Sequence, residues 1–328
     1  LMSVMKKWWF SMVCLWMSFG VEAQNELFSR QYFLNNYLVN PAVGGINDYM
    51  DLRMSYSRQW TAIENSPKSV LLTFNTNLAR EKDQVLRYSY ADRKYVIGKG
   101  HLDYNGRKIK HGVGAKVTYD NVNVFSYTDM SLSYACHVPL NPYLTLAVGV
   151  GGGLSMSVMD LNDYEVGNED DPLYRTGKRK EMTPLVEAGI WLYSSGPYIG
   201  GSFSRYMEDP YDEDGETRYN NLYAVAGWQL YFGQFVFTPS VMYRNNGYTG
   251  DGLDVNAVLW YAGLVWMGGS LRHLEDPSIH MGVLIKNIFE VNYTYDINKS
   301  SWGASHEIGV AFRIWKRAEE CKNKWYFR

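Results

Sequence analysis

Hydrophobic and polar residues alternate with period two along most of the chain from residue 51 onward. In the segment 126–138, Met130, Leu132 and Tyr134 share one face of an extended strand, and Ser131 and Ser133 share the other. Successive side chains of a β-strand point to opposite faces, so the pattern predicts strands with one apolar and one polar face.

The alternation predicts fourteen strands. They cover residues 51–58, 69–78, 112–120, 126–138, 143–156, 184–193, 198–207, 219–231, 235–245, 254–261, 264–272, 279–287, 291–297 and 307–314. An even number of strands is typical of single-chain bacterial outer-membrane barrels.

Two all-β architectures fit such a pattern, a soluble sandwich and a transmembrane barrel. Many predicted strands approach the ~9–11 residues that cross a bilayer at a tilt, and exceed the ~5–6 residues usual in globular sheets. The polar face also carries small residues in runs, such as Gly149, Gly151 and Gly153, which suit a crowded barrel interior. We therefore expect an all-β fold, a transmembrane antiparallel β-barrel.

The lengths of the predicted connections favour the barrel as well. From the fourth strand onward, short connections such as 139–142 alternate with longer ones such as 157–183 and 246–253. Outer-membrane barrels have short periplasmic turns and long outer loops, so this parity places both chain ends in the periplasm. The long segment 79–110 falls on the periplasmic side. It could plug the lumen or bind a partner, or form a surface loop with its own hairpin.

The N-terminus predicts export. Lys6 and Lys7 precede an apolar stretch over 8–19, and small residues at Val21 and Ala23 follow, as in a signal peptide cut before Gln24. We expect a signal peptide over 1–23 with its start at Met5. A periplasmic segment over 24–50, the barrel over 51–315 and a periplasmic tail over 316–328 should follow.

The composition of the mature chain fits this location. Its 30 basic and 33 acidic residues give a net charge of −3, which offers no reason to expect nucleic acid as a partner. Aromatic residues make up 16% of the sequence, which suits aromatic girdles at two membrane interfaces.

Candidate chemistry is sparse. The sequence contains no Gly-x-Ser-x-Gly, no His-Glu-x-x-His and no phosphate-binding glycine loop, so we expect no catalytic residue and no cofactor. Acidic stretches at 168–171 and 208–216 carry the oxygen ligands that calcium prefers without the spacing of a calcium loop. His137 and His280 should face inward, but we expect no metal site because each lacks neighbouring ligands.

Charged residues on the polar faces should line the lumen. Their mixed signs favour pairing across the lumen over a ring of one sign that selects ions. The predicted lumen-lining charges are Arg53, Lys116, Asp129, Glu187, Asp254, Lys286, Asp296, Glu307 and Arg313.

The most specific sequence follows the predicted cleavage site. Gln24–Gly45 contains Leu27-Phe28-Ser29-Arg30-Gln31-Tyr32-Phe33 and Asn40-Pro41-Ala42-Val43-Gly44-Gly45. Further motifs follow at Arg58-Gln59-Trp60, Ser66-Pro67-Lys68, 266–272, 293–296 and 305–308. In these motifs and their order, the chain resembles the PorP/SprF family of outer-membrane proteins of Bacteroidota.

The resemblance implies a non-enzymatic outer-membrane component of the type IX secretion system. Such a protein would work with periplasmic ring and peptidoglycan-linking proteins, or in surface attachment of cargo such as a gliding-motility adhesin. The residues expected to contact partners are Phe28, Tyr32, Asn40, Pro41, Gly44, Trp60 and Pro67. The alternatives are an outer-membrane diffusion or solute-uptake channel and, less favoured, a membrane-embedded hydrolase. The sequence leaves open whether the lumen is plugged.

Overall fold

The computed structural model describes residues 29, 31–78, 87–89, 94–96, 109–141, 143–160, 178–207, 220–246, 250–297 and 302–315. The expected signal peptide (1–23) and tail (316–328) therefore lie outside the described residues. Among the described residues, no helix is both long and apolar enough to cross a membrane.

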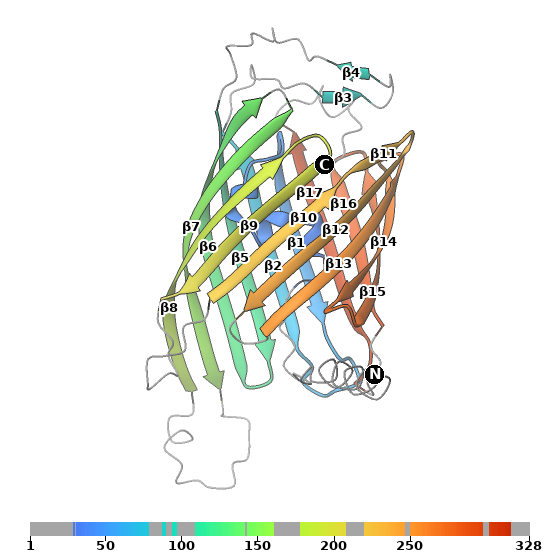
Figure 1. The fold of residues 1–328 in the computed structure, drawn as a ribbon. Helices are drawn as coiled ribbons and strands as arrows, with labels where there is room; N and C mark the ends of the chain where they lie inside the picture. Colours follow the sequence, from blue (N-terminus) through green and yellow to red (C-terminus); the bar gives the residue numbers. More distant parts are fainter. Residues whose placement is uncertain are drawn as a thin grey trace, which may run out of the picture.

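Antiparallel strands form one closed barrel (Figure 1). The strands are β1 (Tyr49–Arg58), β2 (Lys68–Asn77), β5 (Lys110–Val122), β6 (Phe125–Asn141), β7 (Leu144–Asp160), β8 (Lys178–Tyr193), β9 (Pro197–Tyr206), β10 (Asn220–Trp228), β11 (Leu230–Phe232), β12 (Phe235–Asn246), β13 (Gly250–Tyr261), β14 (Val265–Arg272), β15 (Asp276–Ile285), β16 (Phe289–Asp296) and β17 (Ser305–Trp315). β10 and β11 pair one after the other with β12, so they form one interrupted strand and the barrel has fourteen, as predicted.

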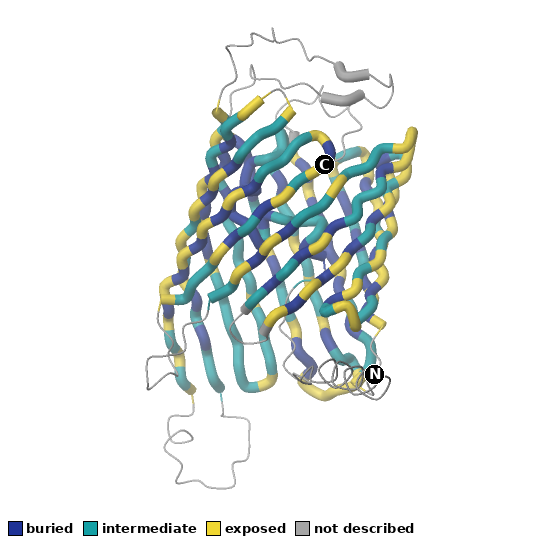
Figure 2. The backbone as a smooth tube through the Cα atoms, in the orientation of Figure 1, coloured by how far each residue is buried: buried dark blue, intermediate teal, exposed yellow. Residues whose placement is uncertain are grey.

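The first and last strands close the ring. β1 pairs with β17 from Tyr49 opposite Trp315 to Arg58 opposite His306. Along β17, Ile308 and Ile314 are exposed on the outside, whereas Glu307 and Arg313 are buried on the inside. Exposed and buried residues alternate in this way around the barrel (Figure 2). The apolar face of each strand is therefore the outer one, as expected for a wall that faces lipid.

The strands differ greatly in length. β6 and β7 have 17 residues each and β8 has 16, whereas β14 and β16 have 8. The long strands exceed the ~9–11 residues that a tilted strand needs to cross a bilayer. One side of the barrel therefore extends beyond the membrane.

The two ends of the barrel have different connections. One end, here called the long-loop end, holds 59–67, 123–124, 161–177, 207–219, 247–249, 273–275 and 297–304. The other, here called the short-turn end, holds 78–109, 142–143, 194–196, 233–234, 262–264 and 286–288. The predicted alternation is not strict, because the strands extend further than predicted: the loop expected over 246–253 shrinks to 247–249, and the one expected over 273–278 shrinks to 273–275.

The long segment 79–110, which was expected on the side of the short turns, contains a small hairpin. β3 (Arg87–Ser89) pairs with β4 (Lys94–Val96) in a separate two-stranded sheet. This supports the hairpin among the alternatives for 79–110, and most of the remaining segment lies outside the described residues.

Candidate functional site: the plugged lumen

The N-terminal segment lies inside the barrel. Residues 31–46, here called the plug, form three short 3-10 turns, η1 (Tyr32–Leu34), η2 (Asn36–Leu38) and η3 (Pro41–Val43). Tyr32, Tyr37 and Ala42 are almost completely buried against residues of the barrel wall such as Trp191. The plug belongs to the segment 24–50, which we expected to be periplasmic, and it reaches β1 only after crossing the lumen.

The plug runs along the barrel axis. The Ser29 hydroxyl donates to Glu307 Oε1 over 2.7 Å, near the end of β17 that belongs to the long-loop end. At the short-turn end, Asn77 Nδ2 donates to the Asn47 carbonyl over 2.7 Å. The described residues between 29 and 47 therefore run from the long-loop end to the short-turn end. The chain ends, which we expected at the short-turn end, lie outside the described residues.

The plug packs most tightly against β5–β8, which together with β9 are here called the glycine wall. A methyl group added to Gly112 would overlap Gly44, one on Gly149 would overlap Ala42, and one on Gly189 would overlap Asn40. Because only glycine lets two backbones approach so closely, the small residues of the lumen face form a seat for the plug.

Hydrogen bonds join the plug backbone to this wall. Asn40 caps η3 by accepting from the Ala42 N–H over 2.9 Å, and its Nδ2 donates to the carbonyls of Ile190 and Gly201 over 3.0 Å each. Lys116 Nζ donates to the Leu38 carbonyl over 3.1 Å, and His137 Nε2 donates to the Gly44 carbonyl over 2.8 Å. Backbone groups that the short turns leave without partners are satisfied by the wall.

On the opposite side, the plug contacts β13–β17 and β1, here called the polar wall, through side chains. Gln31 Nε2 donates to Thr294 Oγ1 over 2.8 Å, and the Tyr32 hydroxyl bonds to the Asn256 amide. The Phe33 ring packs edge-on against His280, with 4.9 Å between ring centroids. His280 does face inward, as predicted, and bonds to Thr294 Oγ1 over 2.8 Å.

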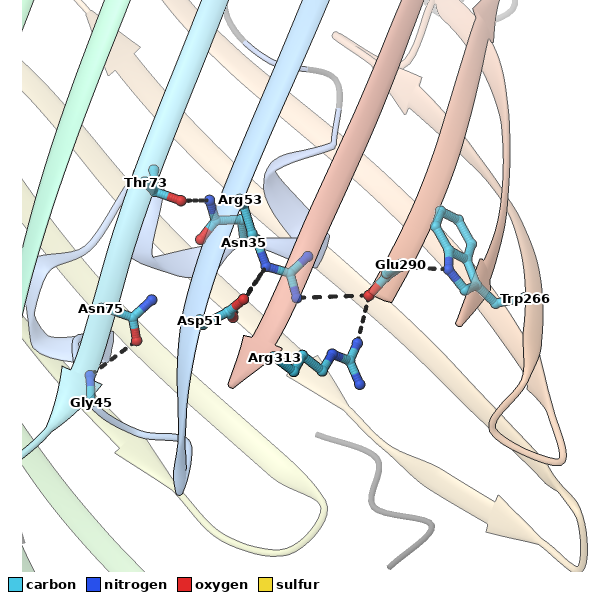
Figure 3. Close-up of polar contacts among 9 residues, drawn as sticks. All are labelled: Asn35, Gly45, Asp51, Arg53, Thr73, Asn75, Trp266, Glu290 and Arg313. Carbon is cyan, nitrogen blue, oxygen red and sulfur yellow. Dashed lines mark hydrogen bonds and ion pairs between the residues drawn. The ribbon is translucent and has the colours of Figure 1, made fainter. Parts of the chain in front are cut away.

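A buried charge cluster lies behind the plug in the polar wall (Figure 3). Glu290, which has no exposed surface, accepts from Arg313 Nη2 at 2.5 Å and from Trp266 Nε1 at 3.2 Å. Arg53 Nη2 lies 3.9 Å from the same carboxylate, and Arg53 Nε is 3.1 Å from Asp51 Oδ1. Two arginines therefore balance two carboxylates, which is how buried charge is tolerated.

Further ion pairs brace the lumen elsewhere. Lys116 Nζ lies 2.5 Å from Glu187 Oε1, and Arg244 Nε lies 3.5 Å from Asp254 Oδ2. Asp129 accepts from Ser155 over 2.5 Å and from Tyr206 over 2.8 Å. These contacts pair opposite charges within one side of the barrel, between adjacent strands such as β12 and β13 or along the wall from β5 to β8, and do not form a ring of one sign. Pairing across the lumen stays a prediction.

A cavity of about 170 Å³ lies on the long-loop side of the plug. Leu38, Val39 and Pro41 of the plug form part of its lining, together with Ser57 of β1 and Ser69 of β2. The plug thus forms the inner boundary of a polar recess.

The structure places most of the predicted lumen charges on the inside. Arg53, Lys116, Asp129, Glu187, Asp254, Asp296, Glu307 and Arg313 all lie on lumen faces of their strands. Lys286 does not: β15 ends at Ile285, and Lys286 and Asn287 have φ of 51° and 57° in an exposed turn. Two consecutive positive φ values are typical of a type I′ hairpin turn, and they end the alternation two residues early.

Sequence reasoning missed the centre of the buried cluster. Glu290 was assigned to a turn because Ile288-Phe289-Glu290 separates two predicted strands, yet β16 begins at Phe289. Asp51 and Arg244 also lie on lumen faces and were not named. Asp51 and Arg244 already lay within the predicted strands 51–58 and 235–245, so the alternation of faces would have indicated them, whereas Glu290 required β16 to begin two residues earlier than predicted.

The residues expected to contact partners divide into two groups. Tyr32, Asn40, Pro41 and Gly44 are buried in the plug or its seat, so they are occupied by contacts within the chain. Trp60 lies in the β1–β2 connection at the long-loop end, where its ring packs edge-on against Trp302 at 5.0 Å, and the Pro67 carbonyl accepts from the Gln59 N–H over 2.9 Å. Phe28 lies outside the described residues.

Metal chemistry has no support in the part of the chain that is described. There, no group of three or more His, Cys, Asp or Glu side chains could hold a metal ion. The acidic stretches 168–171 and 208–216 lie outside the described residues.

Solved structures similar to this chain include an outer membrane protein and porins. The Acinetobacter baumannii outer membrane protein Omp33 aligns with a TM-score of 0.46 at 8% identity, over 82% of this chain and 100% of that one. A mutant porin of Rh. blastica aligns with a TM-score of 0.36 at 6% identity, over 81% and 99%. The KdgM porin aligns with a TM-score of 0.33 at 8% identity, over 80% and 98%. A search of curated proteins found no match.

A closed antiparallel barrel with an apolar outer face, a charged interior and its own N-terminal segment in the lumen defines a plugged β-barrel of the outer membrane. The model of one family, the type IX secretion system membrane protein PorP/SprF, matches residues 21–312. The chain therefore belongs to the PorP/SprF family, and is an outer-membrane component of the type IX secretion system.

Proposed function

We propose that this protein is a non-enzymatic barrel that supports the secretion and surface attachment of type IX cargo, such as a gliding adhesin, and does not serve as a diffusion channel. The observation that carries the proposal is the plug, which contacts the glycine wall and the polar wall at once. A lumen occupied in this way favours a role based on contacts with other proteins over a role in solute flow.

The unequal ends of the barrel support an orientation. Barrels of this class turn short connections to the periplasm and long ones to the outside. In our proposal the long-loop end, with Trp60 and Pro67, faces the cell surface and the cargo. The short-turn end faces the periplasmic ring and peptidoglycan-linking proteins.

Two measurements test the function. Deleting the gene should remove one or more type IX cargo proteins from the cell surface, as measured by quantitative proteomics of surface-exposed proteins. The purified barrel should show no steady single-channel conductance in planar bilayers. An unchanged set of surface proteins would contradict the secretion role, and a steady conductance would favour the channel.

A further inference from the structure

The strand β8 extends beyond its neighbour β9 at the long-loop end. β8 pairs with β7 along its whole length, from Lys178 opposite Asp160 to Tyr193 opposite Thr145. It pairs with β9 only from Leu185 to Tyr193, and the Met207 N–H adds one more bond to the Pro184 carbonyl over 2.9 Å. Figure 1 shows β7 and β8 continuing past the end of β9.

Strand geometry shows which backbone groups this leaves open. In an antiparallel sheet the N–H and C=O of one residue point to the same neighbour, and alternate residues point to opposite neighbours. Because the Pro184 carbonyl faces the β9 side, the backbone groups of Met182, Lys180 and Lys178 face that side too. Among the described residues, no strand pairs with them there.

This segment extends past the apolar belt. Met182 is 60% exposed on the outer face, but the next outward residues toward the long-loop end are Lys180 and Lys178. Charged side chains on the outer face are costly within the hydrocarbon region, so this edge lies beyond it, in water. An aqueous sheet edge with unpaired backbone groups is a template for another strand.

The side chains at the edge select the charge of the partner. Lys178 Nζ pairs with Asp160 over 2.9 Å, and Arg179 pairs with Glu181, whereas Lys180 has no carboxylate within ion-pair distance in the described part of the chain. Lysines on a sheet edge oppose pairing with another strand, because their charge must be accommodated in the pair. A strand with acidic side chains opposite Lys180 would neutralise this charge.

We propose that the edge of β8 from Lys178 to Met182 is a docking site for an extended, acidic segment of the surface cargo, which adds to the barrel sheet as a further strand. The inference rests on the proposed function and its orientation, and names the recognition surface. Backbone hydrogen bonds provide the affinity, and Lys180 provides the preference for acidic residues.

A proline substitution tests the backbone contact. Met182→Pro removes an N–H that points to the open edge and leaves the β7 ladder intact, as the natural Pro184 already does two residues later. Met182→Ala is the matched control because it keeps that N–H. Heat-dependent migration in gel electrophoresis checks that both variants fold.

The readout is the amount on the cell surface of the cargo protein that gene deletion removes. We expect Met182→Ala and Lys180→Arg to retain wild-type amounts, and Met182→Pro and Lys180→Glu to retain about tenfold less. If deletion removes the cargo but Met182→Pro retains as much as Met182→Ala, the secretion role stands and the docking edge is wrong. If deletion of the gene removes no cargo, the secretion role and the docking edge are both wrong.

Hydrogen exchange on the purified wild-type barrel identifies the occupant. The amides of Lys180 and Met182 should exchange rapidly in the isolated barrel and become protected in its complex with the cargo. Protection in the isolated barrel would mean that the protein's own chain, such as the acidic connection 208–219, already covers the edge, and would overturn the inference.

Discussion

The plug is held by two walls in different ways. On the glycine wall its backbone touches the strand backbone at Gly112 and Gly149, and wall side chains such as Lys116 donate hydrogen bonds to plug carbonyls. On the polar wall the described plug residues make side-chain contacts, as between Gln31 and Thr294. Where two backbones touch, the wall residue must be glycine, whereas side-chain contacts can be made by other residue types after repacking. The comparison indicates that the glycine wall fixes the position of the plug and the polar wall stabilises its charges.

The largest expected effect lies in the polar wall. Glu290→Gln leaves Arg313 and Arg53 without their shared carboxylate in a buried site, so the free energy of unfolding should fall by about 3–5 kcal/mol. Urea unfolding followed by tryptophan fluorescence measures the change. The control is Lys178→Gln, which breaks an exposed ion pair and should change stability by less than about 1 kcal/mol. Equal effects of both substitutions would contradict the importance of the buried cluster.

A bulky residue in the glycine wall should displace the plug. Gly149→Leu forces a side chain into Ala42 and should cost roughly 3 kcal/mol by overpacking. We expect this variant to show an ion conductance in planar bilayers that the wild type lacks. Gly152→Leu is the control, because Gly152 lies on the outer face of the same strand, where an added Cβ would lie 4.0 Å from its nearest neighbour. If the two variants behave alike, the plug does not depend on its seat.

The smallest effects compare single plug residues on the two walls. Asn40→Ala removes the η3 cap and two hydrogen bonds to the glycine wall, so it should destabilise the plug by roughly 2 kcal/mol. Gln31→Ala removes one bond to the polar wall, which is worth roughly 1 kcal/mol. Hydrogen exchange of the Val43 and Gly44 amides measures both. Faster exchange in Gln31→Ala than in Asn40→Ala would reverse the comparison.

The barrel was predictable because lipid imposes a simple rule on its strands. Residues that point outward, such as Met130, Leu132 and Ile308, must be apolar. Because successive side chains point to opposite faces, apolar residues recur at every second position, and this does not depend on which strand is the neighbour. Turns with positive φ interrupt the rule without warning, which is why Lys286 was placed inside. The same limit explains Glu290, whose strand begins directly after such a turn.

The plug could not be predicted in this way. Its short 3-10 turns have neither period two nor a helical period, so Tyr32, Tyr37 and Ala42 showed no pattern that indicates burial. The informative signal was in the wall, where glycines occupy lumen positions such as Gly149. They indicated a crowded interior but did not identify the segment that fills it.

The position of the plug in the chain bears on how the protein is made. Residues 31–46 precede β1, and the ring closes only when β17 pairs with β1. During synthesis the plug residues are therefore made before any strand of the barrel, and the closing strand β17 is made last. The strands can therefore assemble around a plug that is already present, so the plug does not have to be inserted into a closed barrel.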